Sequence, residues 1–154
     1  MRKKRERAIA APRNTVAEER YKLYSSAWHR IHEAIDSRFF LEAISLTESL
    51  ISDRLESRLS YLRGADFGFK TIGQLIDEAS RIETDPELLD LITTELDSWR
   101  KARNKAAHEM VKIEAGQSLS WEERLAHNES IAREGFRMLG LVGGRVNALQ
   151  DHSV

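Results

Sequence analysis

The stretch "DSWRKARNKAAHEMVK" (residues 97–112) starts as the continuation of an amphipathic helix and then departs from its own pattern. At about 100° per residue, Arg103 falls near the middle of the apolar sector, where a Leu or Ala is expected. A histidine, His108, follows five residues later. A lone guanidinium in an apolar sector is costly, so its placement needs a reason. The apolar residues that share this sector are Leu88, Ile92, Leu96, Trp99, Ala107 and Met110.

A second, polar stripe runs along the flank of the same helix. Its members follow each other at spacings of four, three and four residues. Arg103 and His108 are about 140° apart around the helix axis, and Asn104 lies between them. One edge carrying a guanidinium, an amide and an imidazole can hold a phosphate and transfer a proton, but it cannot easily surround a substrate alone. The polar stripe consists of Asp97, Lys101, Asn104 and His108.

An earlier amphipathic segment, residues 39–62, has a similar exception. Glu48 falls inside its apolar stripe, where a single buried carboxylate would be unfavourable. We therefore expect Glu48 to accept hydrogen bonds from Arg103 and to fix its planar fork in position. The alternative is a purely structural Arg–Glu pair, with His108 as an ordinary solvated residue. Helical geometry alone does not decide between the two.

The bulk composition indicates a single all-helical domain. The chain has 154 residues, 41% of them hydrophobic and 32% charged, with only two prolines, a mixture that suits a core of reasonable size and solvated helix faces. The absence of cysteine excludes disulfides and thiolate metal sites, and a cytoplasmic location is expected. No run of about 18 apolar residues predicts a membrane span. The net charge of −1 means that any affinity for nucleic acid must come from local patches.

Capping signals divide the chain into helices. They predict an all-α fold, an up-and-down four-helix bundle with one additional short helix, because short links favour antiparallel neighbours. Residues 1–14 are expected to form a basic, disordered N-terminal arm, and residues 15–152 the helical domain. The helix starts are a capping box at Thr15 and Glu18, the segment from Phe39 to Leu62, Thr71 before a short helix, Asp85–Pro86 before a long one that ends near Ile113, and a second capping box at Ser120 and Glu123 before a helix that ends near Gln150.

The six residues "RNKAAH" (103–108) resemble the signature of the HEPN superfamily, an Arg followed by a polar residue and then, within a few positions, a His. The position of the motif near the end of a long helix, late in an all-helical chain, is similar to that family. The stretch "EAISLTESLISDRLESRLSYL" (42–62) also resembles the second helix of prokaryotic HEPN proteins. The resemblance covers roughly residues 20 to 150.

The resemblance implies a metal-independent endoribonuclease that needs no cofactor. Such domains form homodimers in which two motifs face one composite cleft. Arg103 would bind the scissile phosphate, and His108 would act as general acid or base for attack by the RNA 2′-hydroxyl. Asn104 would orient the phosphate or the imidazole. The context would be phage defence or a toxin–antitoxin pair, with an antitoxin or another regulatory protein as partner. The alternative is a non-catalytic HEPN module that binds RNA or nucleotides or serves as an adaptor.

One departure from the family concerns regulation. In toxins that are paired with nucleotidyltransferase antitoxins, a Tyr stands two residues after the His, and here that position is Met110. Control by modification of such a tyrosine is therefore not supported.

Other side chains suggest contacts with RNA. Arg100, Lys101 and Lys105 make the motif helix locally basic and are expected to contact RNA. Three aromatic residues of the first helix could stack on bases, although aromatics at helical spacing more often belong to the core. His29 and His32 lie one turn apart without an evident third ligand, so we expect no metal site. The three aromatic residues are Tyr21, Tyr24 and Trp28.

Overall fold

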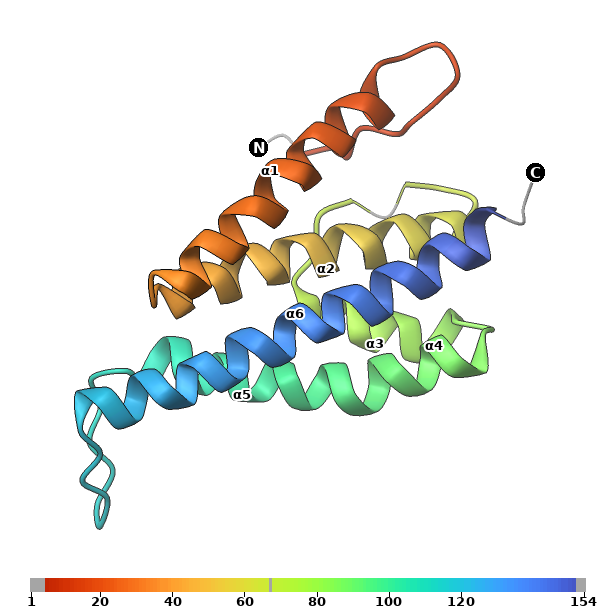
Figure 1. The fold of residues 1–154 in the computed structure, drawn as a ribbon. Coiled ribbons are helices and arrows are strands. Elements are labelled where there is room, and N and C mark those ends of the chain that lie inside the picture. Colours follow the sequence, from red (N-terminus) through yellow and green to blue (C-terminus); the bar gives the residue numbers. More distant parts are fainter. Residues whose placement is uncertain (1–4, 67, 152–154) are drawn as a thin grey trace.

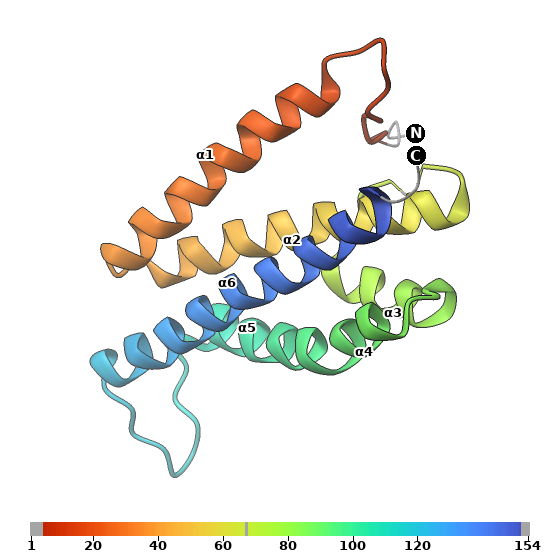
Figure 2. The same ribbon diagram turned by 45° about the vertical axis from the view of Figure 1, so that its right-hand side comes forward.

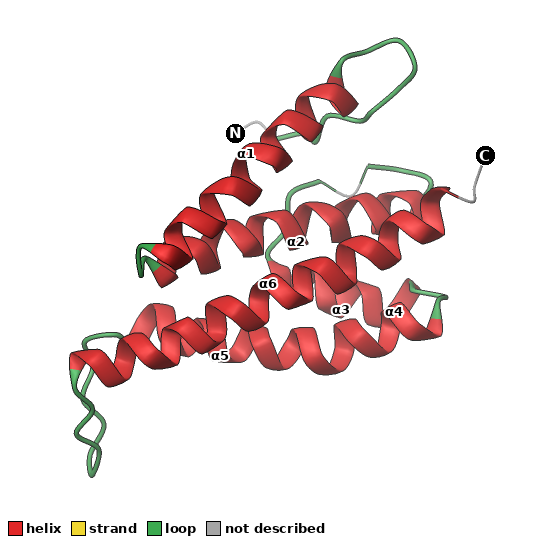
Figure 3. Ribbon diagram, viewed as in Figure 1, coloured by secondary structure: helices red, strands yellow, loops and turns green. Residues whose placement is uncertain are grey.

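The computed structural model describes residues 5–66 and 68–151, and within these ranges the chain forms helices and loops without strands (Figure 3). None of the helices described is long and apolar enough to cross a bilayer. The elements are α1 (Val16–Asp36), α2 (Phe40–Arg63), α3 (Ile72–Ile82), α4 (Pro86–Leu91), a π-helix η1 (Ile92–Leu96), α5 (Asp97–Glu109) and α6 (Trp121–Asp151).

The expected all-α fold, with four long helices and a short one, is confirmed. Helix α2 is central, since it packs against α1, α3 and α6, while α4, η1 and α5 together form one long helix (Figures 1 and 2). One core of buried apolar side chains runs through the molecule. It includes Ile51 and Leu55 of α2, Leu96 of η1 and Val142 of α6, all without exposed surface.

Most of the predicted helix caps are present. The Thr71 hydroxyl accepts from Gln74 N while the Gln74 side chain accepts from Thr71 N, and Ser120 with Glu123 forms the same reciprocal pair. The Asp85 carboxylate caps α4 by accepting from Leu88 N at 2.9 Å. The capping box predicted at Thr15 is wrong, because the Thr15 side chain makes no cap hydrogen bond. The Asn14 side chain accepts from Val16 N instead, at 3.3 Å.

The N-terminal half of α1 diverges from the rest of the bundle (Figure 1). The buried residues of α1 all lie in its second half, Ile31, Ala34 and Ile35. The segment before α1 runs back to α2, where Arg7 forms ion pairs with Asp53 at 2.7 Å and with Glu56 at 3.3 Å. Within the arm expected for residues 1–14, the Arg7 side chain is only 6% exposed. Residues 1–4 lie outside the described ranges.

The long helix that was expected from Pro86 to about Ile113 contains a wider turn. Residues Ile92–Leu96 form a π-helix, and α5 ends at Glu109. The hydroxyls of Thr93 and Thr94 donate to the carbonyl oxygens of Leu89 and Asp90, at 2.8 and 2.5 Å. These carbonyls are the ones that an α-helical amide ladder would use, so the two threonines favour the irregular turn. π-turns are rare in helices and occur often near functional sites.

A glycine allows α6 to approach α5 closely. A Cβ atom at Gly135 would lie 2.6 Å from Cζ2 of Trp99. The Trp99 ring cannot easily move aside, because it is buried and its Nε1 donates to Ile131 O at 2.9 Å. Gly135 therefore fixes the packing of α6 against the helix that carries Arg103.

This close approach predicts the effect of one added methyl group. We expect Gly135→Ala to lower the free energy of unfolding by about 1–3 kcal/mol, the usual cost of overpacking. Gly140→Ala is the matched control, because a Cβ there meets nothing within 4 Å. Removal of a helical glycine should stabilise that variant by about 0.5–1 kcal/mol. Urea unfolding of both variants measures the difference, and equal midpoints would contradict the proposed packing constraint.

Candidate functional site

The candidate site centres on an ion pair between α2 and α5. The Arg103 guanidinium donates a hydrogen bond to the Glu48 carboxylate, as expected from the sequence. Their side chains are 16% and 25% exposed, respectively. A partly buried guanidinium needs such a partner, since its desolvation would otherwise be unfavourable. Glu48 thereby restricts the orientation of the planar Arg103 fork.

The environment of Glu48 makes its carboxyl a weaker acid. Burial raises the pKa of Glu48 above its ordinary value, and the nearby Arg103 charge offsets this effect only in part. The proton affinity of Glu48 is therefore greater in the folded protein than in the unfolded chain. The carboxylate that holds Arg103 in place therefore takes up a proton at a higher pH than a glutamate of the unfolded chain does.

The other two predicted site residues lie on the outer side of α5. Asn104 is half-buried and His108 is exposed. The apolar sector differs slightly from the expected one, because Ala106 is buried and Ala107, which was expected to belong to it, is exposed. Trp99 and Ala106 are seven residues apart, which is almost two turns. The two residues therefore face nearly the same side of the helix, the side that packs against the core.

The basic residues predicted to contact RNA do not form one uniform patch. Arg100 and Lys101 both pair with Asp97, at 2.9 and 3.1 Å, and Arg100 lies over Gly73 of α3. Lys105 is exposed. Asp97 is therefore a counter-ion that the site prediction did not include. Its spacings of three and four residues from Arg100 and Lys101 are the signal that could have identified it.

The end of α5 is closed by α6. Arg124 donates to the carbonyl oxygens of Glu109 and Met110, at 3.1 and 3.2 Å, and so satisfies two groups that a helix end leaves free. A cleft of about 880 Å³ lies beside this contact. Its lining includes Lys105 and His127 but not Arg103, Asn104 or His108. The Arg103–His108 edge therefore lies outside this cleft.

His127 is a site candidate for which the sequence offered no pattern. It lies on α6 and reaches the same cleft as Lys105 only because α5 and α6 pack together. His32, by contrast, packs against the rings of Trp28 and Phe136. Among the described residues, no cluster of three or more His, Asp or Glu side chains could hold a metal ion.

The chain was compared with known proteins in three ways. No protein-family model matches it, and neither the curated proteins nor the solved structures include a significant match.

The raised pKa of Glu48 predicts a specific pH dependence. The folded state binds a proton at Glu48 more readily than the unfolded state does, so the contribution of this group to stability decreases as pH rises. Relative to Glu48→Gln, which keeps an oxygen acceptor but cannot ionise, the wild type should lose stability as pH rises above about 4.5, until Glu48 is fully ionised. Urea unfolding of both proteins between pH 4 and 7 measures this difference. A wild-type advantage that grows with pH would indicate a lowered pKa instead.

Proposed function

We propose that the protein is a HEPN-type, metal-independent endoribonuclease that acts as a homodimer. The observation that carries this proposal is the Arg103–Glu48 pair, which holds a guanidinium at the edge of α5 that also presents Asn104 and the exposed imidazole of His108. An oriented guanidinium suits the bidentate recognition of a phosphodiester. An imidazole titrates near neutral pH and suits proton transfer.

A buried pair elsewhere in the fold shows how a purely structural pair differs from this one. Arg58 and Glu83 pair at 2.7 Å with side chains 6% and 0% exposed, and Glu83 also accepts from Thr84 N and Asp85 N. Nothing outside the protein can reach that carboxylate. The Arg103 side chain retains more exposure, and a solvent-exposed histidine follows it on the same helix. The Arg103–Glu48 pair, unlike the Arg58–Glu83 pair, is therefore the one that a substrate can reach.

The proposed reaction is transesterification within the RNA chain. The 2′-hydroxyl oxygen attacks the adjacent phosphorus, a 2′-O–P bond forms and the P–O5′ bond breaks. One His108 takes the proton from the 2′-hydroxyl, and a second acid group protonates the departing 5′-oxygen. Arg103 stabilises the negative charge that develops on the phosphoryl oxygens, while Asn104 orients the phosphate or the imidazole. The products are a 2′,3′-cyclic phosphate and a 5′-hydroxyl.

A second copy of the chain supplies what one edge lacks. Arg103 and His108 are separated by about 7.5 Å along the helix axis and 140° around it, so one copy does not direct both groups to opposite sides of one phosphate. Two copies that face each other would contribute one imidazole for each proton transfer. Lys101 and Lys105 are exposed on the same helix and would attract the RNA backbone. The resemblance places such an enzyme in phage defence or in a toxin–antitoxin pair.

The mechanism predicts cleavage of RNA in the presence of EDTA. We expect His108→Ala to lower the cleavage rate of a labelled RNA by about 10²- to 10⁴-fold, as loss of a general acid or base does. Arg103→Ala should lower it by at least about 10²-fold, through lost charge stabilisation. His29→Ala is the matched control, because it removes an exposed histidine from α1 and should cleave like the wild type.

The products and an unreactive substrate complete this test. The 5′ fragment should end in a 2′,3′-cyclic phosphate and the 3′ fragment should begin with a 5′-hydroxyl. An RNA with 2′-O-methyl groups should remain intact. Equal activity of the wild type, His108→Ala and Arg103→Ala would eliminate the proposed mechanism. RNA binding without cleavage by the wild type would support the alternative, a non-catalytic RNA-binding module.

The composite site also predicts a dependence on protein concentration. Below the dissociation constant of the dimer, the specific activity should rise in proportion to protein concentration, because only dimers carry a complete site. Sedimentation measured over the same range should show the monomer–dimer transition at the same concentration. Constant specific activity for a protein that is monomeric throughout would exclude the composite site.

A further inference from the structure

A second cleft lies on the opposite side of α2 from α3, where α1 diverges from the bundle. Its volume is about 600 Å³, and residues of α1, α2 and α6 form its walls. Three aromatic side chains of α1 line it, Tyr21, Tyr24 and Trp28, and Tyr21 is 74% exposed. A cleft of this size suits a single small ligand. Tyr21 offers an exposed flat face on which a planar ring can stack, whereas the Arg54 guanidinium lies over the Tyr24 ring and Trp28 packs against Phe136.

The charged residues of the cleft are all cationic. Arg20 and Arg54 line it, and among its described lining residues none is acidic. Asn147 and Gln150 add side-chain amides, and although Asn147 Oδ1 accepts from Arg54, the amide NH₂ groups can donate to the edge of a heterocyclic ring. This combination fits a ligand that carries both a planar polar ring and a negative charge.

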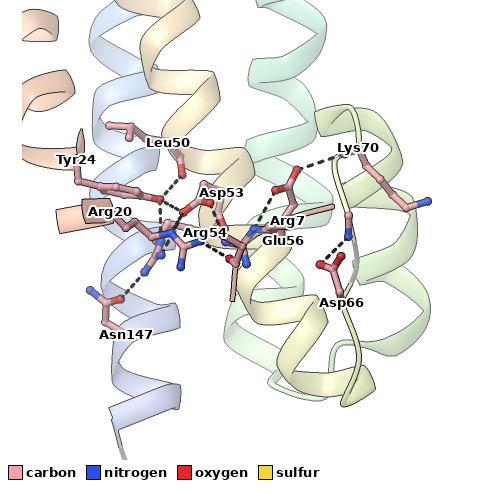
Figure 4. A network of polar contacts seen from close by, with 12 residues as sticks. Arg7, Arg20, Tyr24, Leu50, Asp53, Arg54, Glu56, Asp66, Lys70 and Asn147 are labelled. Carbon is pink, nitrogen blue, oxygen red and sulfur yellow. Dashed lines mark hydrogen bonds and ion pairs between the residues drawn. The ribbon is translucent and has the colours of Figure 1, made fainter. Parts of the chain in front are cut away.

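A hydrogen-bond network holds the two arginines in place (Figure 4). Arg54 Nε donates to the Tyr24 hydroxyl at 2.9 Å, and Arg54 Nη2 donates to Asp53 at 3.2 Å. Arg20 Nη2 donates to Ala8 O at 3.1 Å, and its Nε lies 3.5 Å from Asp53. Arg54 Nη1 also donates to Asn147 Oδ1 at 3.4 Å. A guanidinium has five N–H groups, so these contacts still leave donors on both arginines for a ligand.

The charge of this network favours an anion. Burial works to raise the pKa of Asp53, but hydrogen bonds from Tyr24 and Arg7 and the charges of Arg7 and Arg20 outweigh it, so that the pKa is lowered and Asp53 stays ionised. Asp53 and Glu56 together face three arginines, Arg7, Arg20 and Arg54. The network therefore keeps a net positive charge, and two of its three cations line the cleft.

The α6 wall of the cleft is open. A Cβ atom at Gly140, Gly143 or Gly144 would meet nothing within 4 Å, in contrast to Gly135, where Trp99 fills the space. The backbone of α6 is thus accessible across the cleft from the aromatic residues of α1. A flat ring could lie between the two walls.

We propose that this cleft binds a nucleotide, with the base between the α1 aromatics and the glycine surface of α6 and the phosphate at Arg20 and Arg54. The nucleotide is either a free mononucleotide or one unit of a single-stranded RNA, since both present the same base and phosphate. The site is separate from Arg103 and His108, so it does not depend on the proposed ribonuclease function.

Calorimetric titration of the full chain with 5′-AMP tests the proposal. Adenosine, which lacks the phosphate, should bind at least tenfold more weakly than 5′-AMP. In Gly143→Leu the added side chain enters the cleft, and its Cβ meets no other atom within 4 Å. This variant should bind 5′-AMP at least tenfold more weakly than the wild type. Its thermal midpoint should stay at or above that of the wild type, because leucine favours a helix more than glycine does. Ala148→Leu is the matched control, because it adds the same side chain to α6 at an exposed position outside the cleft lining. This variant should bind like the wild type.

A parallel titration distinguishes the two sources of the nucleotide. The probe is a 2′-O-methyl oligonucleotide of five adenosines, which cannot undergo the proposed cleavage. If this oligonucleotide binds and 5′-AMP does not, and if Gly143→Leu weakens its binding, the cleft is assigned to RNA. His108→Ala should bind either probe like the wild type, so loss of cleavage and loss of binding are separate results. The proposal is overturned if neither probe binds, or if Gly143→Leu binds both as tightly as the wild type does.

Discussion

The contact between Arg103 and Glu48 is the interaction on which the organisation of the candidate site depends. Neither charge would be stable alone at these positions, since both side chains are largely removed from solvent. Together they connect α5 to the central helix α2 and define the direction in which the guanidinium points. The same pair explains why Arg103 can replace an apolar residue on a stripe that otherwise packs against the core. Asn104 and His108, on the adjoining flank, stay available to a partner or substrate.

Helix α2 links the two polar regions of the molecule. Glu48 lies toward α5, while Asp53 and Arg54 lie toward α1, α6 and the segment before α1. Between them, the buried residues Ile51 and Leu55 belong to the common core. An amphipathic helix normally has one polar face exposed to solvent, but the charged groups of a central helix need partners from other elements. The charged positions of α2 therefore mark contacts between elements.

Helix boundaries and the Arg103–Glu48 pair were predictable from the sequence, because local rules apply to them. Capping residues such as Asp85 and Ser120 act on amide groups only a few residues away. An acid and a base that each interrupt an apolar stripe need a partner, and the chain contains few candidates. The π-turn at Ile92–Leu96 was not predictable in this way, since helical periodicity assumes a constant rotation per residue. The contacts of Arg7 were missed because a basic terminal segment has no periodicity that would indicate its binding site.

By itself, the sequence determined the all-helical class, the positions of most helix ends and the edge that carries Arg103, Asn104 and His108, because these properties depend on residues close together along one helix. Only the tertiary structure decided that α1 diverges from the bundle, that Arg20 and Arg54 share a cleft with the glycines of α6, and that Gly135 rather than Gly140 accommodates a tryptophan. These arrangements depend on how helices far apart in the chain pack against each other. The physical reason is that a periodic pattern specifies which face of a helix is buried, but not which neighbour covers it.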